Sequence, residues 1–427
     1  MKKDLSSTLR MGRYLLLICC ISVFSARSAP AQSFDLLLKG GHVIDPANGI
    51  DARMDVAIDD GKIALVTEDI PASEAEQLVD AAGFYITPGL IDLHSHHYYG
   101  TQPHSDYSNG FWALPPDGFT FRAGVTTAVD GGGAGWRDFR HFKEQVIDRS
   151  DTRILAFLNL LGRGMKNRDV LSQNMNDMDP KMTALVARQY DEIVGIKIAH
   201  YRGDTWEPFH RAVQAGEEAG IPVMVDFSGA ESPLSLEGLL LDVLRPGDIY
   251  THIYSMVDGS VIDESGTLRE GMLQAQQQGT ILDVGHGAGS FHYPVAVPAT
   301  EQGLWPNTIS TDLHASSMNG GAKDMANTMS KMLNLGMSLQ EVIEASTWTP
   351  AQVIQREELG HLSEGAVADV AVFNLLEGDF GYLDVRENLM PGRHKLQAEL
   401  TIRAGEVVWD LNGMAGNLWR EDLSVVD

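Results

Sequence analysis

The stretch Ile86-Thr87-Pro88-Gly89-Leu90-Ile91-Asp92-Leu93-His94-Ser95-His96 decides the fold of this chain. It is a short apolar run entered through a Pro-Gly turn, a pattern that predicts a buried strand. Successive side chains on a strand point to opposite faces, so His94 and His96 share one face. Their backbones are then about 6–7 Å apart, and two imidazoles at that spacing can converge on one divalent metal ion. Two ordinary loop histidines would give the same pattern, so the rest of the chain must decide.

Composition narrows the class of protein. The 427 residues are 44% hydrophobic and 21% charged, which is ordinary for a globular protein with a full core. The formal net charge is -26. Such acidity argues against a nucleic-acid partner, because proteins bind the phosphates of nucleic acids through basic patches. We therefore expect no nucleic-acid partner.

The N-terminus predicts a signal peptide over residues 1–31. Four basic residues within the first 13 precede the apolar run 14–24, and Ala29-Pro30-Ala31 is a small-x-small cleavage site. A lipoprotein signal at Cys19 or Cys20 is the alternative, although Ile18 stands where such signals usually have a small residue. The run is shorter than the roughly 20 residues that span a bilayer, so we expect no stable membrane anchor. The protein is then exported, to a periplasm or outside the cell.

Both cysteines of the chain lie inside this signal. The mature protein would contain none, which excludes disulfides, thiolate metal sites and a cysteine nucleophile. Any metal ion must then be held by nitrogen and oxygen ligands.

The order of patterns along the chain predicts the architecture. Alternating apolar and polar residues between turn signals occur near both ends, at 34–87 and again at 368–373 and 400–409. We expect 32–88 and 362–427 to form one small β-sandwich. Between them, over 89–361, short apolar strands alternate with helical stretches, which predicts parallel βα units. The span suits an α/β fold of the (β/α)8 TIM-type barrel, typically about 250 residues.

Polar residues end the later strands of this barrel at a regular interval. Their spacings are 29, 26, 34 and 26 residues, close to one βα unit each. The residues are Lys197, Asp226, His252, His286 and Asp312. Active sites of such barrels lie at the carboxyl ends of the strands. His94 and His96, at the end of the first strand, would lie on the same rim as these five residues. Taken singly, each has an ordinary alternative: a lysine pointing outward, a hydrogen-bonded core histidine, or an aspartate capping a helix.

The combined motifs resemble the amidohydrolase superfamily, in its deacetylase-like metallohydrolase branch related to dihydroorotase and D-aminoacylase. The matching segments are 88–96, Gly124-Val125-Thr126-Thr127, Gly195-Ile196-Lys197, 244–252, 283–287 and Thr311-Asp312. The resemblance covers nearly all of the mature chain.

This resemblance implies a metal centre and its ligands. Two zinc ions are expected, with one ion as the alternative. His94 and His96 would bind the first metal and His252 the second, with a carboxylated Lys197 between them. Asp312 would ligate the first metal and act as general base. A buried lysine near other cations has a lowered pKa, which makes its neutral amine reactive toward carbon dioxide.

Asp226 departs from the pattern of this branch, which has a histidine after the fifth strand. In the first alternative, which we favour, Asp226 replaces that histidine as an oxygen ligand, which zinc accepts. In the second alternative, Asp226 lies behind the ligands and does not touch the metal. In the third alternative the second metal is weak or absent, with His200 or another residue compensating.

The predicted reaction is hydrolysis of an amide by metal-activated water. The expected substrate is a small molecule, an N-acyl (above all N-acetyl) amino acid or a similar compound. His286, His200 and Arg202 are the candidate substrate-binding residues, and an arginine can pair with a carboxylate bidentately. Residues 97–120 form a candidate substrate loop. A cyclic amidase like dihydroorotase or hydantoinase, or an esterase or lactonase, would use the same metal site. A non-catalytic binding protein would lose the base or the ligands, which are present here. Homo-oligomers are common among similar proteins.

Overall fold

The computed structural model describes residues 34–100, 112–165, 173–228, 233–256 and 260–419. The predicted signal peptide at 1–31 and the alternative lipoprotein cysteines lie outside these residues, as does part of the 97–120 loop. Within the described ranges, no helix is both long and apolar enough to cross a bilayer.

One sheet consists of seven parallel strands in sequential order. The strands are β6 (Leu90–Ser95), β7 (Val125–Asp130), β8 (Arg153–Asn159), β9 (Ile193–Ile198), β10 (Val223–Val225), β11 (Ile249–Thr251) and β12 (Ile281–Asp283). Residues 308–313 join its two edges through parallel bridges from Thr308 to Asp283 and from Leu313 to Ser95. The sheet therefore closes on itself, as the predicted barrel requires.

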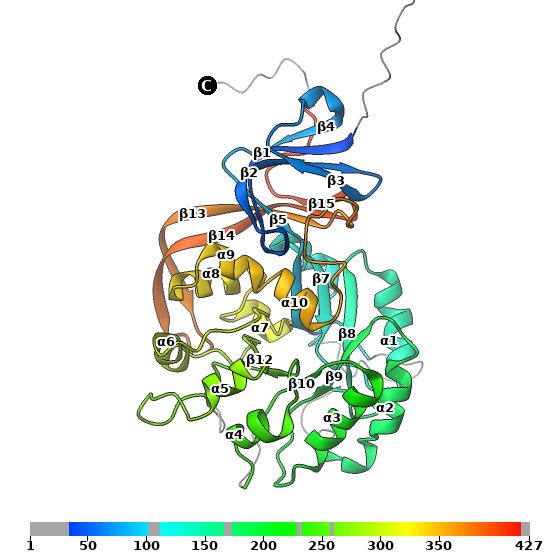
Figure 1. Cartoon of the computed structure of the whole chain (residues 1–427), viewed down its shortest axis with the longest axis vertical. Helices are drawn as coiled ribbons and strands as arrows, with labels where there is room; N and C mark the ends of the chain where they lie inside the picture. Colours follow the sequence, from blue (N-terminus) through cyan, green and yellow to red (C-terminus); the bar gives the residue numbers. More distant parts are fainter. Residues whose placement is uncertain (1–33, 101–111, 166–172, 229–232, 257–259, 420–427) are drawn as a thin grey trace, which may run out of the picture. The chain divides into compact units, whose positions relative to one another are not determined.

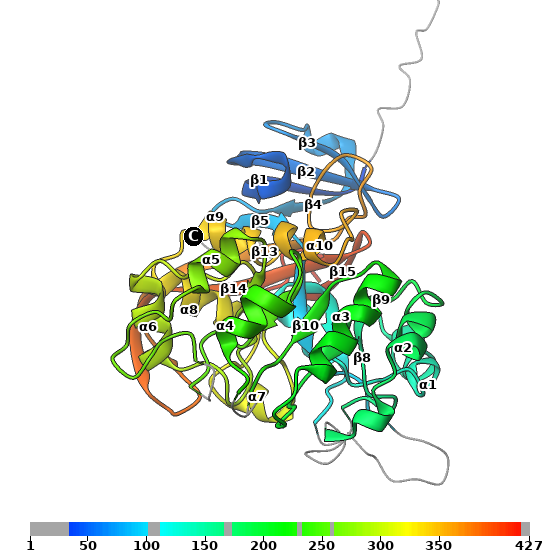
Figure 2. The same ribbon diagram turned by 60° about the horizontal axis from the view of Figure 1, so that its bottom comes forward.

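Helices follow most strands and lie around the outside of this sheet (Figures 1 and 2). They are α1 (Phe139–Gln145), α2 (Pro180–Ala187), α3 (Glu207–Ala219), α4 (Leu236–Gly238), α5 (Met272–Gln277), α6 (Tyr293–Glu301), α7 (Ala315–Asn319), α8 (Met325–Leu335), α9 (Leu339–Glu344) and α10 (Trp348–Val353). In α3, Phe209, Ala212 and Ala215 recur on one face and are buried. The helix ends because Gly220 adopts a left-handed conformation, with φ at 74°.

The two ends of the chain build a second sheet of eight strands. They are β1 (Phe34–Asp45), β2 (Ile50–Asp59), β3 (Lys62–Thr67), β4 (Ala75–Asp80), β5 (Tyr85–Pro88), β13 (Val370–Leu383), β14 (Leu389–Arg403) and β15 (Glu406–Asp410). Strand β5 pairs with β1 on one side and with β13 on the other. The predicted pairing of the two ends is therefore present, but as one continuous hydrogen-bonded sheet. Residues from both ends, such as Val56 and Leu400, share one apolar core.

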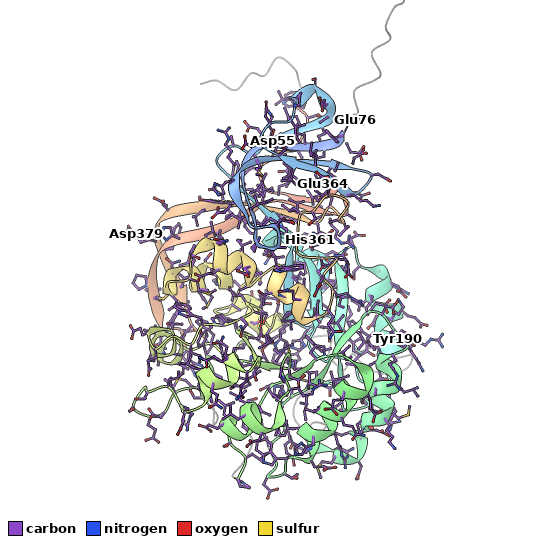
Figure 3. All side chains as sticks on the ribbon, in the orientation of Figure 1. Asp55, Glu76, Tyr190, His361, Glu364 and Asp379 are labelled. Carbon is purple, nitrogen blue, oxygen red and sulfur yellow. The ribbon has the colours of Figure 1, made fainter. Side chains whose placement is uncertain are left out.

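β13 and β14, with 14 and 15 residues, are the longest strands in the described part of the chain, and their hairpin extends beside α8 and α6 (Figures 1 and 2). Asp379, labelled in Figure 3, lies on this hairpin, and its side chain is 92% exposed. At the tip, the Val385 N–H donates to the Phe291 carbonyl, at 3.2 Å. The tip of the end sheet thus contacts the segment that follows β12.

Candidate metal centre

A cavity of about 570 Å³ lies at the carboxyl ends of the parallel strands. All six predicted metal ligands line it: His94, His96, Lys197, Asp226, His252 and Asp312. They lie in or directly after β6, β9, β10 and β11, and in the closing segment 308–313. Parallel strands in a barrel all end on the same rim, which explains why residues one βα unit apart meet here.

His94, His96 and Asp312 form the tightest cluster in the cavity. His96 Nε2 lies 2.8 Å from Asp312 Oδ1, and His94 Nε2 lies 3.7 Å from the same oxygen. Ligand atoms of all three residues lie within 4.8 Å of one another. Two imidazole nitrogens and a carboxylate oxygen are a donor set that zinc accepts. These residues therefore fit the metal that the sequence predicts.

Hydrogen bonds behind the histidines set which ring nitrogen faces the cavity. The Thr251 hydroxyl donates to buried Asp283, at 2.7 Å, and its oxygen lies 3.1 Å from His94 Nδ1. Because that hydroxyl proton is already used, His94 Nδ1 carries a hydrogen and donates it, which leaves Nε2 free to bind a metal. His252 Nδ1 likewise donates to the Gly285 carbonyl, at 2.5 Å. Asp283 and Thr251 are anchors that the sequence reasoning did not single out.

Lys197 is buried in β9, with 1% of its surface exposed. Its Nζ lies 3.0 Å from His94 Nε2 and 3.2 Å from Met224 Sδ. Burial lowers the pKa of Lys197, against the opposing effect of nearby carboxylates such as Asp226. A neutral amine beside the histidines is the form that carbamylation requires.

Asp226, which stands where the family pattern has a histidine, pairs with His200, a residue that follows the preceding strand β9. His200 Nε2 lies 2.9 Å from Asp226 Oδ2, and His252 Nε2 lies 3.9 Å from the same oxygen. Burial raises the pKa of Asp226, but the neighbouring imidazoles outweigh it and hold this pKa far below its usual range. The Asp226 carboxylate in turn raises the pKa of His200. The missing fifth-strand imidazole is thus replaced by a carboxylate with a histidine beside it, an arrangement compatible with ligation or with support of His252.

Backbone strain concentrates at this site. Eight described non-glycine residues have a positive φ, and three of them line the cavity: His200 at 56°, His252 at 69° and Asp312 at 45°. The left-handed conformation is costly for residues with a side chain and persists only where the surroundings enforce it. The tight turns let the side chains at these strand ends point inward.

Three further predictions concerned substrate binding. His200 and Arg202 line the cavity, as expected. His286 does not: it is fully buried, stacks on Phe291 with ring centroids 4.6 Å apart, and lies 2.6 Å from Lys331 Nζ. The interval along the chain located its backbone correctly, but left-handed Gly285 and Gly287 on either side turn the chain so that its ring points away. The structure therefore does not support the prediction that His286 contacts the substrate.

Two aromatic wall residues were missed. His314 and Trp112 line the cavity with ring centroids 4.8 Å apart, and His314 Nε2 lies 4.0 Å from Asp312 Oδ2. Trp112 comes from the segment 112–120, and the Ala315 N–H donates to its carbonyl. The position of Trp112 within the predicted 97–120 loop was the available signal.

Replacing Gly287 by Ala should lower kcat about 100-fold and also lower the melting temperature, because the left-handed conformation is costly for alanine. A Cβ there would overlap with Asp312 Oδ2, and φ at 57° is already left-handed. Displacing a reacting group by about 1 Å can cost two orders of magnitude. Steady-state kinetics and thermal unfolding would measure both effects. Gly266→Ala is the matched control, because φ is also positive there but the added Cβ meets nothing within 4 Å. Equal kcat in the two variants would contradict the prediction.

Comparison with known proteins identifies the family. Residues 298–408 match the model of the amidohydrolase family. A deacetylase of Brucella anthropi is 36% identical over 342 residues, covering 78% of this chain and 82% of that protein. A deacetylase of Agrobacterium fabrum is 36% identical over 332 residues, covering 76% and 79%. The chain belongs to the amidohydrolase family.

Solved structures agree with this assignment. A dihydroorotase structure has a TM-score of 0.77 and 32% identity, covering 88% of this chain and 97% of that one. An adenine deaminase structure has a TM-score of 0.78 and 26% identity, covering 89% and 100%. The chain is thus a deacetylase-like hydrolase of carbon–nitrogen bonds.

Proposed function

We propose that this protein is an exported zinc amidohydrolase that cleaves the amide of an N-acyl amino acid, above all an N-acetyl one. The observation that carries the proposal is the convergence of His94, His96 and Asp312 in a cavity that Arg202 also lines. Similarity to two deacetylases supports an acyl-amide substrate. The signal-like residues 1–31 are the basis for proposing export.

His94, His96 and Asp312 would hold the first zinc ion, and Asp226 and His252 the second, with carboxylated Lys197 joining the two. Zinc bound there would lower the pKa of water toward neutrality and polarise the substrate carbonyl. Asp312 takes the proton from the attacking water and delivers it to the leaving nitrogen. The Thr251 and Gly285 contacts keep His94 and His252 in the orientation that ligation needs.

A cyclic amidase is the second candidate. The dihydroorotase structure, at 32% identity, favours it directly. Both reactions attack an amide carbonyl with water, so the metal site does not separate them. The two kinds of substrate differ in the leaving nitrogen. Hydrolysis of an open-chain amide releases the nitrogen in a separate product, whereas hydrolysis of a cyclic amide opens the ring and leaves the nitrogen attached to the same molecule.

Metal analysis and a substrate panel would test the proposal. Protein beginning at residue 32, purified without chelator, should contain about two zinc ions per chain, and Asp226→Asn should contain fewer. N-acetyl amino acids of both configurations and dihydroorotate should then be assayed side by side. Turnover of the acetylated compounds supports the proposal, and turnover of dihydroorotate alone would replace it with the cyclic amidase. Protein without metal or turnover would contradict both.

Replacing Arg202 by Met should raise KM for N-acetyl amino acids about 10- to 100-fold. Among the residues that the structure describes, no ion pair engages its guanidinium, which lines the cavity and can bind a substrate carboxylate. Hydrogen bonds to charged groups are worth about 1.5–3 kcal/mol. Turnover of an N-acetyl amine without a carboxylate should not change. Arg188→Met, outside the cavity, is the control, and an equal KM rise for both substrates would refute this role.

A further inference from the structure

Lys331 on α8 is a lysine with none of its surface exposed to solvent. Its Nζ lies 2.6 Å from the Gly321 carbonyl, 2.7 Å from the Leu383 carbonyl and 2.6 Å from His286 Nε2. An ammonium group has three N–H donors, so each donor has an acceptor. A buried lysine is costly unless it is satisfied in this way. The Lys331 amine therefore makes three specific hydrogen bonds that compensate for its burial.

The three acceptors belong to separate parts of the chain. Gly321 follows α7, which comes just after Asp312, and Leu383 ends β13 at the tip of the long hairpin. The turn between β13 and β14 also contacts the segment after β12, because the Asp384 carboxylate accepts a hydrogen bond from the Tyr293 N–H, at 3.2 Å. Lys331 thus ties the hairpin of the end sheet to two segments of the barrel rim.

His286 is fixed on several sides by this arrangement. Since Lys331 donates to Nε2, the hydrogen of the neutral ring is on Nδ1, which donates to the Gly287 carbonyl at 3.0 Å. Phe291 lies parallel to the ring, with an interplanar angle of 3°. The ring therefore has one orientation, set by groups outside the cavity.

The backbone around His286 reaches two residues of the candidate site. The Gly285 carbonyl accepts from His252 Nδ1, at 2.5 Å. The Gly287 N–H donates to the Thr311 carbonyl, at 2.9 Å, and its Cα lies against Asp312 so closely that a Cβ would not fit. One turn, residues 285–287, is thus in contact with both a candidate ligand and the candidate base.

We propose that Lys331 and His286 are positioning residues, which hold the 285–287 turn so that His252 and Asp312 keep their alignment. The hairpin of β13 and β14 supplies one of the anchors, so the end sheet takes part in forming the active site. This inference rests on the proposed function for the role of Asp312. Neither residue touches the substrate cavity, so the effect is on geometry.

The test is Lys331→Met, which keeps the length of the side chain and removes its donors. We expect kcat to fall about 10- to 100-fold while KM stays within about threefold, as for a misaligned reacting group. Asn334→Ala is the matched control. Asn334 lies one turn further along α8 and bonds to the backbone of β14 at Arg393 and His394, without an interaction with His286. It should lower the melting temperature and leave kcat unchanged.

A double-mutant cycle separates positioning from general destabilisation. If Lys331 acts through His286, adding Lys331→Met to His286→Phe should not lower kcat further. Multiplicative losses in the double variant, or a kcat loss in Asn334→Ala equal to that in Lys331→Met, would overturn the inference.

A readout without substrate distinguishes this inference from the proposed function. In protein labelled with ¹⁵N-histidine, the His252 Nδ1 proton should exchange slowly with water, because the Gly285 carbonyl binds it. Lys331→Met should speed that exchange, and Asn334→Ala should not. Unchanged exchange in Lys331→Met would refute the positioning role, whereas absent amidase activity in the wild type with altered exchange would refute only the proposed reaction.

Discussion

Replacing Asp312 by Asn is expected to lower kcat by about 10³-fold while zinc remains bound. Burial raises the pKa of this carboxyl, but the imidazoles of His94, His96 and His314 outweigh it and keep the pKa well below its ordinary value. The carboxylate is then ionised and able to accept a proton from water. General base catalysis contributes about 10²–10⁴-fold.

Steady-state kinetics with the best substrate, together with zinc analysis of the same samples, would measure this effect. An amide keeps the size of the carboxylate and one oxygen ligand but cannot serve as the base. Asp242→Asn, at an exposed position, controls for the change of charge. An Asp312→Asn enzyme with kcat within tenfold of wild type and full zinc would assign the base to another residue. His314, which is not a proposed ligand and whose Nε2 lies 4.0 Å from Asp312 Oδ2, would be the first candidate.

Replacing Lys197 by Ala is expected to lower zinc from about two ions per chain to at most one and to reduce kcat by at least about 100-fold. The reason is the proposed carbamate, which would supply an oxygen to each metal. Truncation also leaves His94 Nε2 and Met224 Sδ without the amine that they contact. Part of any loss is therefore local repacking.

Rescue distinguishes the carbamate from repacking. A short carboxylate such as acetate or formate can enter the space left by Lys197 and bridge the metals, so both zinc content and kcat should rise as it is added. Wild-type protein exposed to ¹³C-bicarbonate should show a carbamate carbon by NMR that Lys197→Ala lacks. One zinc in the wild type, unchanged in Lys197→Ala, would exclude a bridging role and indicate a mononuclear hydrolase.

The sequence predicted the parallel sheet, the pairing of the two chain ends and the six candidate metal ligands that line the cavity. Lys197, Asp226, His252 and Asp312 were found because each lies in or just after a short apolar strand, at intervals of about one βα unit. In a barrel this interval returns the chain to the same rim, so linear spacing carries spatial information. The alternation of a strand placed His94 and His96 on one face for the same reason.

The spacing of residues along the sequence did not predict where side chains point once the chain has left the end of a strand. His286 satisfies the interval, yet Gly285 and Gly287 turn its ring toward Lys331, a partner 45 residues further along. His200 reaches Asp226 through a left-handed backbone that its own sequence does not signal.

The sequence by itself determined which chemical groups reach the rim of the barrel, because hydrophobic periodicity is a local property that each βα unit repeats. Only the tertiary structure decided which of them meet. The Lys331–His286 contact and the anchoring of His94 through Thr251 to Asp283 depend on distant segments packing together. Such contacts form because buried donors and acceptors must be satisfied in the folded core, a condition that no short stretch of sequence expresses.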